Sequence, residues 1–157
     1  MRHKKVVKRQ IAQDKLYKSV LVTRVINRIM KDGKRSVAEK LVYSTLGAIK
    51  EKGLDPVATL DKALSSISPK VEIKARRVGG ANYQVPVEVR GDRKSSLSIR
   101  WLIESAKARS NREYHSFDAK LLAEVMDAIE NKGEAIRKRD IMHKQAEANK
   151  AFAHFRW

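Results

Sequence analysis

The sequence of 157 residues lacks cysteine altogether and is poor in acidic residues, with 18 Asp and Glu against 35 Lys and Arg. Without cysteine the chain forms neither disulfides nor thiolate metal sites, which fits a reducing compartment. No apolar run approaches the roughly 20 residues that a transmembrane helix needs, so we expect no membrane partner. The shortage of acidic residues leaves a formal net charge of +17. That charge repels itself in a compact state and is useful only beside a polyanion.

Motifs that carry chemistry are missing as well. The sequence contains no elbow around a serine and no convincing carboxylate pair, and Gly79-Gly80 is not followed by the Gly-Lys-Ser/Thr of a nucleotide-triphosphate loop. His143 shares one predicted helix face with Asp140 and Glu147. Such a trio is more often a hydrogen-bonded surface cluster than a metal site. We therefore expect no catalytic residues, no cofactor and no metal.

Positive charge is abundant and unevenly distributed. Residues 1–18 hold seven basic residues and one acidic residue, whereas residues 95–130 hold five and six. The basic start of the chain is followed by no long apolar stretch, so we expect no secretory signal peptide. A protein with a few RNA-facing surfaces around an ordinary core is expected to show this segregation of charge.

Apolar residues recur at three- and four-residue spacings and predict six helices. The first three span residues 19–31, 36–52 and 56–67, with Asp55 as the N-cap of the third. The last three are predicted around residues 99–106, around residues 121–129 and from about residue 134, with Trp101 on the border of the fourth helix's apolar stripe. Acidic side chains are expected mostly where helix faces meet water.

A period of two replaces the helical period between residues 70 and 91. Val71, Ile73 and Ala75 alternate with charged residues before a turn at residues 79–82, and a second alternating run follows from Tyr83. This pattern predicts a β-hairpin. Pro86 cannot donate to a strand ladder, so its strand is expected to be an edge.

The predicted fold class is mainly α, a bundle of about six helices with one projecting two-stranded β-hairpin. We expect a single domain over residues 1–157. Its parts are a basic, extended N-terminal arm (1–17), the hairpin (70–91) and a C-terminal helix and tail (134–157).

Three basic segments are candidate RNA contacts. The arm is the strongest, with a solubilising tail as its alternative. In the hairpin, Arg76, Arg77 and Tyr83 suit phosphate binding and base stacking; the alternative is a solvated ribbon with Tyr83 packed on the fourth helix. Residues 137–139, Arg-Lys-Arg, lie at the end of a helix where the dipole disfavours cations, so something other than helix stability is expected to favour them.

Several stretches resemble one known family. Residues 76–90 (RRVGGANYQVPVEVR) are similar to the hairpin signature of small-subunit ribosomal protein seven, bacterial or organellar type. Residues 146–157 (AEANKAFAHFRW) resemble its C-terminal ending, and residues 29–34 and 131–133 resemble two of its helix–loop junctions. Gly91-Asp92 and Gln145 depart from the family pattern.

The resemblance implies a structural constituent of the small subunit, in the cytoplasmic or an organellar ribosome. It implies binding to the 3′ major domain of 16S-type rRNA, nucleation of head assembly, and a place near exit-site tRNA and mRNA. Head and platform proteins of families nine and eleven are the expected neighbours. The residues expected to bind rRNA are Arg2, His3, Lys4, Lys5, Lys8, Arg9, Lys31, Lys34, Arg35, Lys70, Lys74, Arg76, Arg93 and Lys94. Those expected near tRNA or mRNA are Arg77, Gly79, Gly80, Asn82, Tyr83, Lys150, His154 and Arg156.

Two other classes of function are alternatives to this one. A DNA-binding helix bundle with a β-ribbon would carry the same charge, and competition between structured rRNA and duplex DNA separates the two. An RNA-modifying enzyme would need a cofactor loop or a catalytic cluster, and the sequence has neither.

Overall fold

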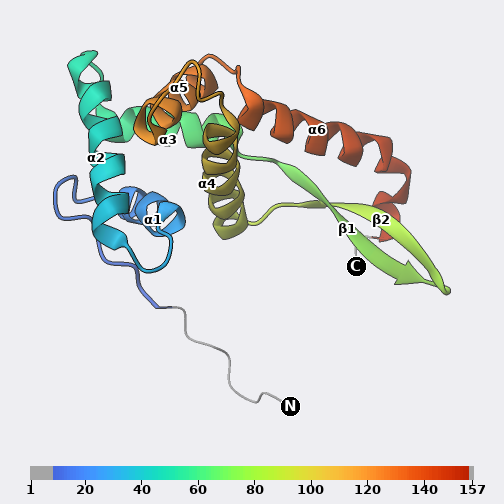
Figure 1. Cartoon of the computed structure of the whole chain (residues 1–157). Coiled ribbons are helices and arrows are strands. Elements are labelled where there is room, and N and C mark those ends of the chain that lie inside the picture. Colours follow the sequence, from blue (N-terminus) through green and yellow to red (C-terminus); the bar gives the residue numbers. More distant parts are fainter. Residues whose placement is uncertain (1–8, 156–157) are drawn as a thin grey trace.

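The computed structural model describes residues 9–155. Within this range the order of elements is α1 (Val20–Ile29), α2 (Arg35–Glu51), α3 (Pro56–Ile67), β1 (Val71–Val78), β2 (Ala81–Glu88), α4 (Gly91–Ala108), α5 (Phe117–Ile129), α6 (Glu134–Ala148) and the 3₁₀ helix η1 (Lys150–Phe155). The first five helices form the body, and α6 and the hairpin project from it on the same side (Figure 1). This confirms the predicted fold class. No helix in the described part of the chain is long and apolar enough to cross a membrane.

The core forms where the predicted apolar stripes of the helices face one another. In α1 the stripe of Val22, Val25, Ile26 and Ile29 is buried as predicted, and every α-helix contributes to the same apolar cluster. Trp101, expected on the border of the apolar stripe, belongs to this core with 8% of its surface exposed. Its large ring lies on the face of α4 that meets the other helices.

Local signals mark the boundary between α2 and α3. The Asp55 carboxylate accepts hydrogen bonds from the backbone N–H groups of Val57 (3.0 Å) and Ala58 (3.4 Å), which confirms it as the N-cap of α3. Gly53 follows the end of α2 with a φ of 77°, a conformation that glycine adopts without a steric penalty.

The hairpin is antiparallel, with Val71 opposite Glu88 and Val78 opposite Ala81. Its turn consists of Gly79 and Gly80, both at positive φ, so the predicted four-residue turn is too long. Two residues suffice because positive φ at both positions matches the twist of the strands.

The expected alternation of the hairpin fails at Glu72, which is 3% exposed. Arg93 Nε donates to its Oε2 at 2.5 Å, and Lys74 Nζ lies 3.3 Å from its Oε1. These cations allow the carboxylate to lie between β1 and the first turn of α4. Glu72 therefore ties the hairpin to the body.

A second buried carboxylate was also not expected, because acidic side chains were assigned to water-facing positions. Glu124 in α5 is 1% exposed; it accepts from Arg109 Nε at 2.7 Å and from the backbone N–H of Ala135 at 2.9 Å. Asp127 also pairs with Arg109, and Lys120 Nζ donates to the Arg109 carbonyl at 2.6 Å. The network joins the end of α4 to α5 and to the start of α6.

The predicted extended arm ends earlier than residue 17. Asp14 is 4% exposed, and its carboxylate accepts hydrogen bonds from the backbone N–H groups of Leu16 and Tyr17 and from the hydroxyl of Tyr43. Burial raises the pKa of Asp14, but these hydrogen bonds outweigh it and hold the pKa below its ordinary value. Residues 14–17 are therefore anchored to α2.

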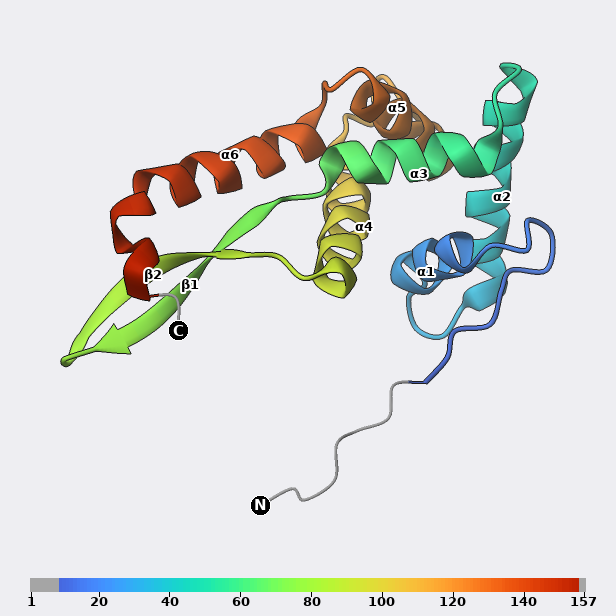
Figure 2. The ribbon, with the colours of Figure 1, turned by 180° about the vertical axis from the view of Figure 1, so that it is seen from behind.

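The end of the chain folds back on the hairpin, with η1 lying against β2 in both views (Figures 1 and 2). The Tyr83 ring packs against Phe152 and Phe155, with centroids 5.3 and 5.1 Å apart. The alternative that Tyr83 packs on the fourth helix is therefore wrong. Its partners lie in a segment after α6 that no periodicity revealed.

Candidate nucleic-acid interface

Ion pairs divide the basic side chains into two groups. The cations paired with carboxylates are Arg35, Lys74, Arg93, Arg109, Lys132, Arg137, Lys138 and Arg139. Arg9, Arg24, Arg28, Lys31 and Lys34 form no ion pair with any residue between 9 and 155. Unpaired cations are the ones most available to phosphates, because no internal anion competes for them.

These five unpaired cations cluster at one end of the body. Arg24 and Arg28 are four residues apart on α1, and Lys31 and Lys34 lie in the loop that follows it. The α1–α2 loop, the start of α4 and the segment entering at Arg9 all lie at the lower end of the body in Figure 1. We call Arg9, Arg24, Arg28, Lys31 and Lys34 the basic face. Three of its five members were predicted rRNA contacts.

Sequence reasoning missed Arg24 and Arg28. Both lie outside the buried stripe of α1, and Asn27 lies beside them. Their i, i+4 spacing opposite an apolar stripe was a usable signal. The signal is weak because each of these cations stands outside any continuous run of charge.

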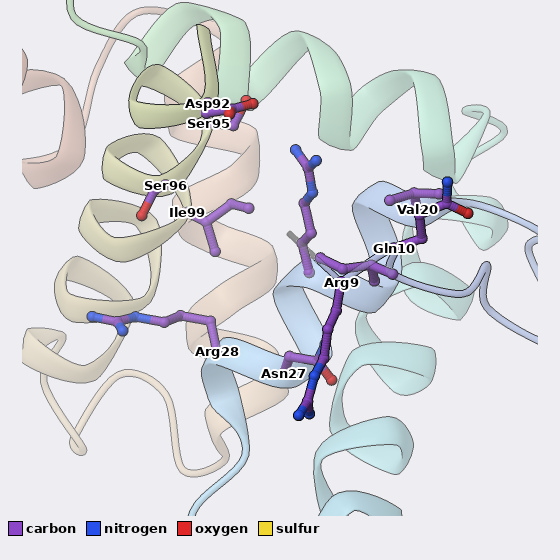
Figure 3. A pocket seen from close by; sticks show the side chains of 11 residues that line it. Arg9, Gln10, Val20, Asn27, Arg28, Asp92, Ser95, Ser96 and Ile99 are labelled. Carbon is purple, nitrogen blue, oxygen red and sulfur yellow. The ribbon is translucent and has the colours of Figure 1, made fainter. Parts of the chain in front are cut away.

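The basic face borders a groove of about 570 Å³ between α1, the segment at Arg9 and the first turns of α4. Figure 3 shows Arg9 and Arg28 among the side chains around it, with Ile99 projecting from α4 towards α1. Asp92, Ser95 and Ser96 line the α4 side. The groove therefore combines positive charge, hydrogen-bonding groups and an apolar interior.

The predicted contacts at the base of the hairpin are partly compensated. Lys74 and Arg93 both pair with buried Glu72, although the two cations remain about half exposed. Lys94 is half-buried and forms no ion pair within the described residues. In the first turn of α4, Arg93 thus lies against the hairpin and Lys94 lines a hollow with Ser65 of α3, while Lys74 lies on the ribbon.

The side chain of Lys70 is exposed, and its backbone is held by a hydrogen bond to α6. Its N–H donates to Nε2 of His143 at 2.9 Å. Burial, followed by the nearby positive charge of Arg139, lowers the pKa of His143 and favours the neutral ring that this bond requires. Among residues 9–155 no group of three His, Asp or Glu side chains is arranged to hold a metal.

The outer part of the ribbon holds the residues expected near tRNA or mRNA. Arg76, Arg77 and Asn82 are exposed beside the glycine turn. Lys150 and His154 come from η1, where His154 Nδ1 lies 2.9 Å from the carbonyl of Ala151. β2 and η1 thus lie side by side at the projecting end of the molecule, which we call the tip. Of the candidates, Arg2, His3, Lys4, Lys5, Lys8 and Arg156 lie outside the described residues.

Residues 137–139 have partners inside the protein. Arg139 Nη1 donates to the carbonyl of Ser66 at 2.6 Å, and Lys138 pairs with Glu104 at 3.0 Å. Arg137 pairs with Glu134 at 3.4 Å. RNA contact by residues 137–139 stays a prediction, since Arg137 pairs within α6 while Lys138 and Arg139 have partners in α4 and α3. Those contacts join α6 to the body.

The chain is similar to known proteins over nearly its whole length. The family model described as ribosomal protein S7p/S5e matches residues 1–150. The small ribosomal subunit protein uS7 of Moorella thermoacetica is 51% identical over 157 residues, covering 99% of both chains. The proteins of the same name from Hydrogenobaculum (50% identical, 98% of this chain and 97% of that one) and Xylella fastidiosa (52%, 95% and 94%) are similarly close. The chain therefore belongs to the ribosomal protein S7p/S5e family.

Proposed function

We propose that this protein binds small-subunit rRNA through the basic face. Its family is one of structural, non-enzymatic ribosomal proteins, so the protein is a constituent of the small subunit of a bacterial-type cytoplasmic ribosome. The observation that carries the proposal is the gathering of five cations without carboxylate partners at one end of the body. They come from α1, from the loop after it and from the segment at Arg9, and none of them pairs with a carboxylate among residues 9–155.

The mechanism has no chemical step. Packing of α1 against the other helices fixes the backbone positions of Arg24 and Arg28, so less of the chain must be ordered when phosphates bind. Neutralising phosphates there lowers the repulsion that opposes bringing RNA helices together. This supports a role in nucleating head assembly on the 3′ major domain of 16S-type rRNA.

The residues proposed to bind rRNA are the fourteen predicted from the sequence together with Arg24 and Arg28. This set is larger than the basic face. Lys74 and Arg93 would contact RNA phosphates while they remain paired with Glu72. Arg35 likewise divides its charge between Glu39, at 2.7 Å, and RNA.

The projecting tip supports a separate role near exit-site tRNA and mRNA. Arg76 and Arg77 are exposed on β1, and no anion among residues 9–155 pairs with them. Arg side chains suit both phosphates and unpaired bases. Neighbouring head and platform proteins, of families nine and eleven, would contact the same side of the subunit. We also propose that residues 1–157 fold as a single domain.

The division of labour is tested by reconstituting small subunits with a protein in which residues 75–84 are trimmed to a short turn. Incorporation should be close to wild type, because the basic face is intact. Retention of tRNA at the exit site, or control of the mRNA path, should change. Failure to incorporate would place the ribbon in the assembly platform instead.

Binding to rRNA itself is tested with a transcript of the 3′ major domain and competing duplex DNA. If the basic face fits a folded RNA junction, a mass excess of duplex DNA should not displace the protein from the transcript. Equal competition by duplex DNA would favour the general DNA-binding reading of the same charges.

A further inference from the structure

The groove beside the basic face has features that phosphate binding alone does not need. Contacts to a sugar-phosphate backbone require exposed cations and hydrogen-bond donors. This groove is instead a hollow of about 570 Å³ whose lining includes Ile11, Val20 and Ile99. A volume in this range is typical of a pocket that encloses a small organic group.

The cations of the groove are placed around this apolar interior. Arg24 is only partly exposed and has no carboxylate partner within residues 9–155. A cation withdrawn from water in this way gains from a bound anion. Arg9 and Arg28 come from two different segments (Figure 3). Their guanidinium groups suit a phosphate, and also the face of a base.

The groove also carries groups that can recognise the edge of a base. The Asn27 amide and the Ser96 hydroxyl make no hydrogen bond with any described residue. An amide presents both a donor and an acceptor, which is the pattern of a base edge. Sequence-specific RNA recognition uses this combination of stacking and edge contacts on unpaired bases.

We propose that the groove holds one unpaired nucleotide of the bound rRNA. Its base enters the hollow against Ile99 and Val20, Asn27 and Ser96 meet its edge, and its flanking phosphates lie on Arg24 and Arg28. The proposal rests on the proposed rRNA binding and deepens it. The basic face then recognises a particular unpaired nucleotide as well as a high density of phosphate.

The test fills the groove without changing its charge. The double variant Asn27→Leu/Ser96→Leu removes both edge groups and occupies part of the hollow. Ala58→Leu/Ala108→Leu is the control, because both alanines are exposed on helices away from the groove. Arg24→Gln removes a phosphate contact. Affinity for the 3′ major-domain transcript is measured over a range of salt concentrations, and thermal unfolding checks the fold of each variant.

The double variant should lose affinity on the order of 10- to 100-fold, as expected for one stacked base, with an unchanged salt slope. Arg24→Gln should lower the salt slope by about one. A base-specific chemical probe of the transcript should show an unpaired base that wild type and the control protect and the double variant exposes. Ser96→Leu alone should act in the same direction and serves if the double variant unfolds.

Two results would overturn the nucleotide site. One is a double variant that binds as tightly as the control, and the other is base protection identical to that of wild type. Either result, with the salt slope of Arg24→Gln still reduced, would leave rRNA binding by the basic face standing. A transcript that wild type binds without salt dependence would instead contradict the proposed function.

Discussion

The hydroxyl of Tyr43 donates a 2.7 Å hydrogen bond to the buried carboxylate of Asp14, 29 residues earlier in the chain. The Tyr17 ring lies 6.1 Å from the Tyr43 ring and covers the same contact. Burial and the bond to Asp14 raise the pKa of Tyr43 to about 12, so the phenol remains a donor at neutral pH. This bond fixes the point from which the N-terminal arm leaves the body.

Tyr43→Phe should therefore destabilise the protein by about 1–2 kcal/mol, because Asp14 loses one of its hydrogen-bond donors in a buried position. Urea unfolding followed by circular dichroism measures the change. Tyr17→Phe is the matched control, since the Tyr17 hydroxyl makes no hydrogen bond with the described residues. Equal stability of the two variants would show that the Asp14–Tyr43 bond contributes nothing.

Glu124→Gln should destabilise the protein more than this, by about 2–4 kcal/mol, because it leaves Arg109 with a single carboxylate in a partly buried site. Chemical denaturation is again the measurement. Glu130→Gln breaks only the exposed ion pair with Lys132 and should leave the denaturant concentration at the unfolding midpoint unchanged. A midpoint for Glu124→Gln that equals that of Glu130→Gln would mean that the network does not join α4, α5 and α6.

The His143–Lys70 bond predicts a pH dependence. Because the folded state lowers the pKa of His143 below 6.5, its contribution to stability is present above that value and is lost as pH falls through the lowered pKa. Between about pH 7.5 and 5.5 the melting temperature of wild type should fall more than that of His143→Gln. His115→Gln, at an exposed position, should follow wild type. Parallel pH curves for His143→Gln and wild type would refute this assignment.

Tyr83→Ala should release η1 from the ribbon, because the ring holds both Phe152 and Phe155. Amide hydrogen exchange at residues 150–155 should become faster, while exchange in α2 stays the same. Tyr83→Phe keeps the ring contacts and should exchange like wild type. Unchanged protection of η1 in Tyr83→Ala would mean that the C-terminal segment is held by other contacts.

Local patterns predicted the helices well because each stripe, such as Val22 to Ile29, is buried on one face of a single element. They failed for Glu72 and Glu124, whose burial depends on Arg93 and Arg109 arriving from elsewhere in the chain. Pairing across such separations leaves no periodic trace in the sequence. The position of Tyr83 was missed for the same reason.

The candidate site shows the same limit. Continuous basic runs pointed to Lys31, Lys34 and Arg9, and the structure places all three around one end of the body. Arg24 and Arg28 each stand outside any continuous run of charge, and sequence reasoning missed them. Which cations are free for RNA depends on partners such as Glu39 and Glu72. Charge patterning therefore located the region but could not separate paired from unpaired cations.

The salt dependence of rRNA affinity tests the central claim most directly. With six or more phosphates neutralised, affinity for the 3′ major-domain transcript should fall on the order of 10³-fold between about 50 and 200 mM salt. Arg28→Gln/Lys31→Gln should lower the slope by about two, whereas Arg137→Gln/Lys138→Gln, which removes cations paired with carboxylates, should change it little. A flat salt response, or equal effects of the two double variants, would contradict binding through the basic face.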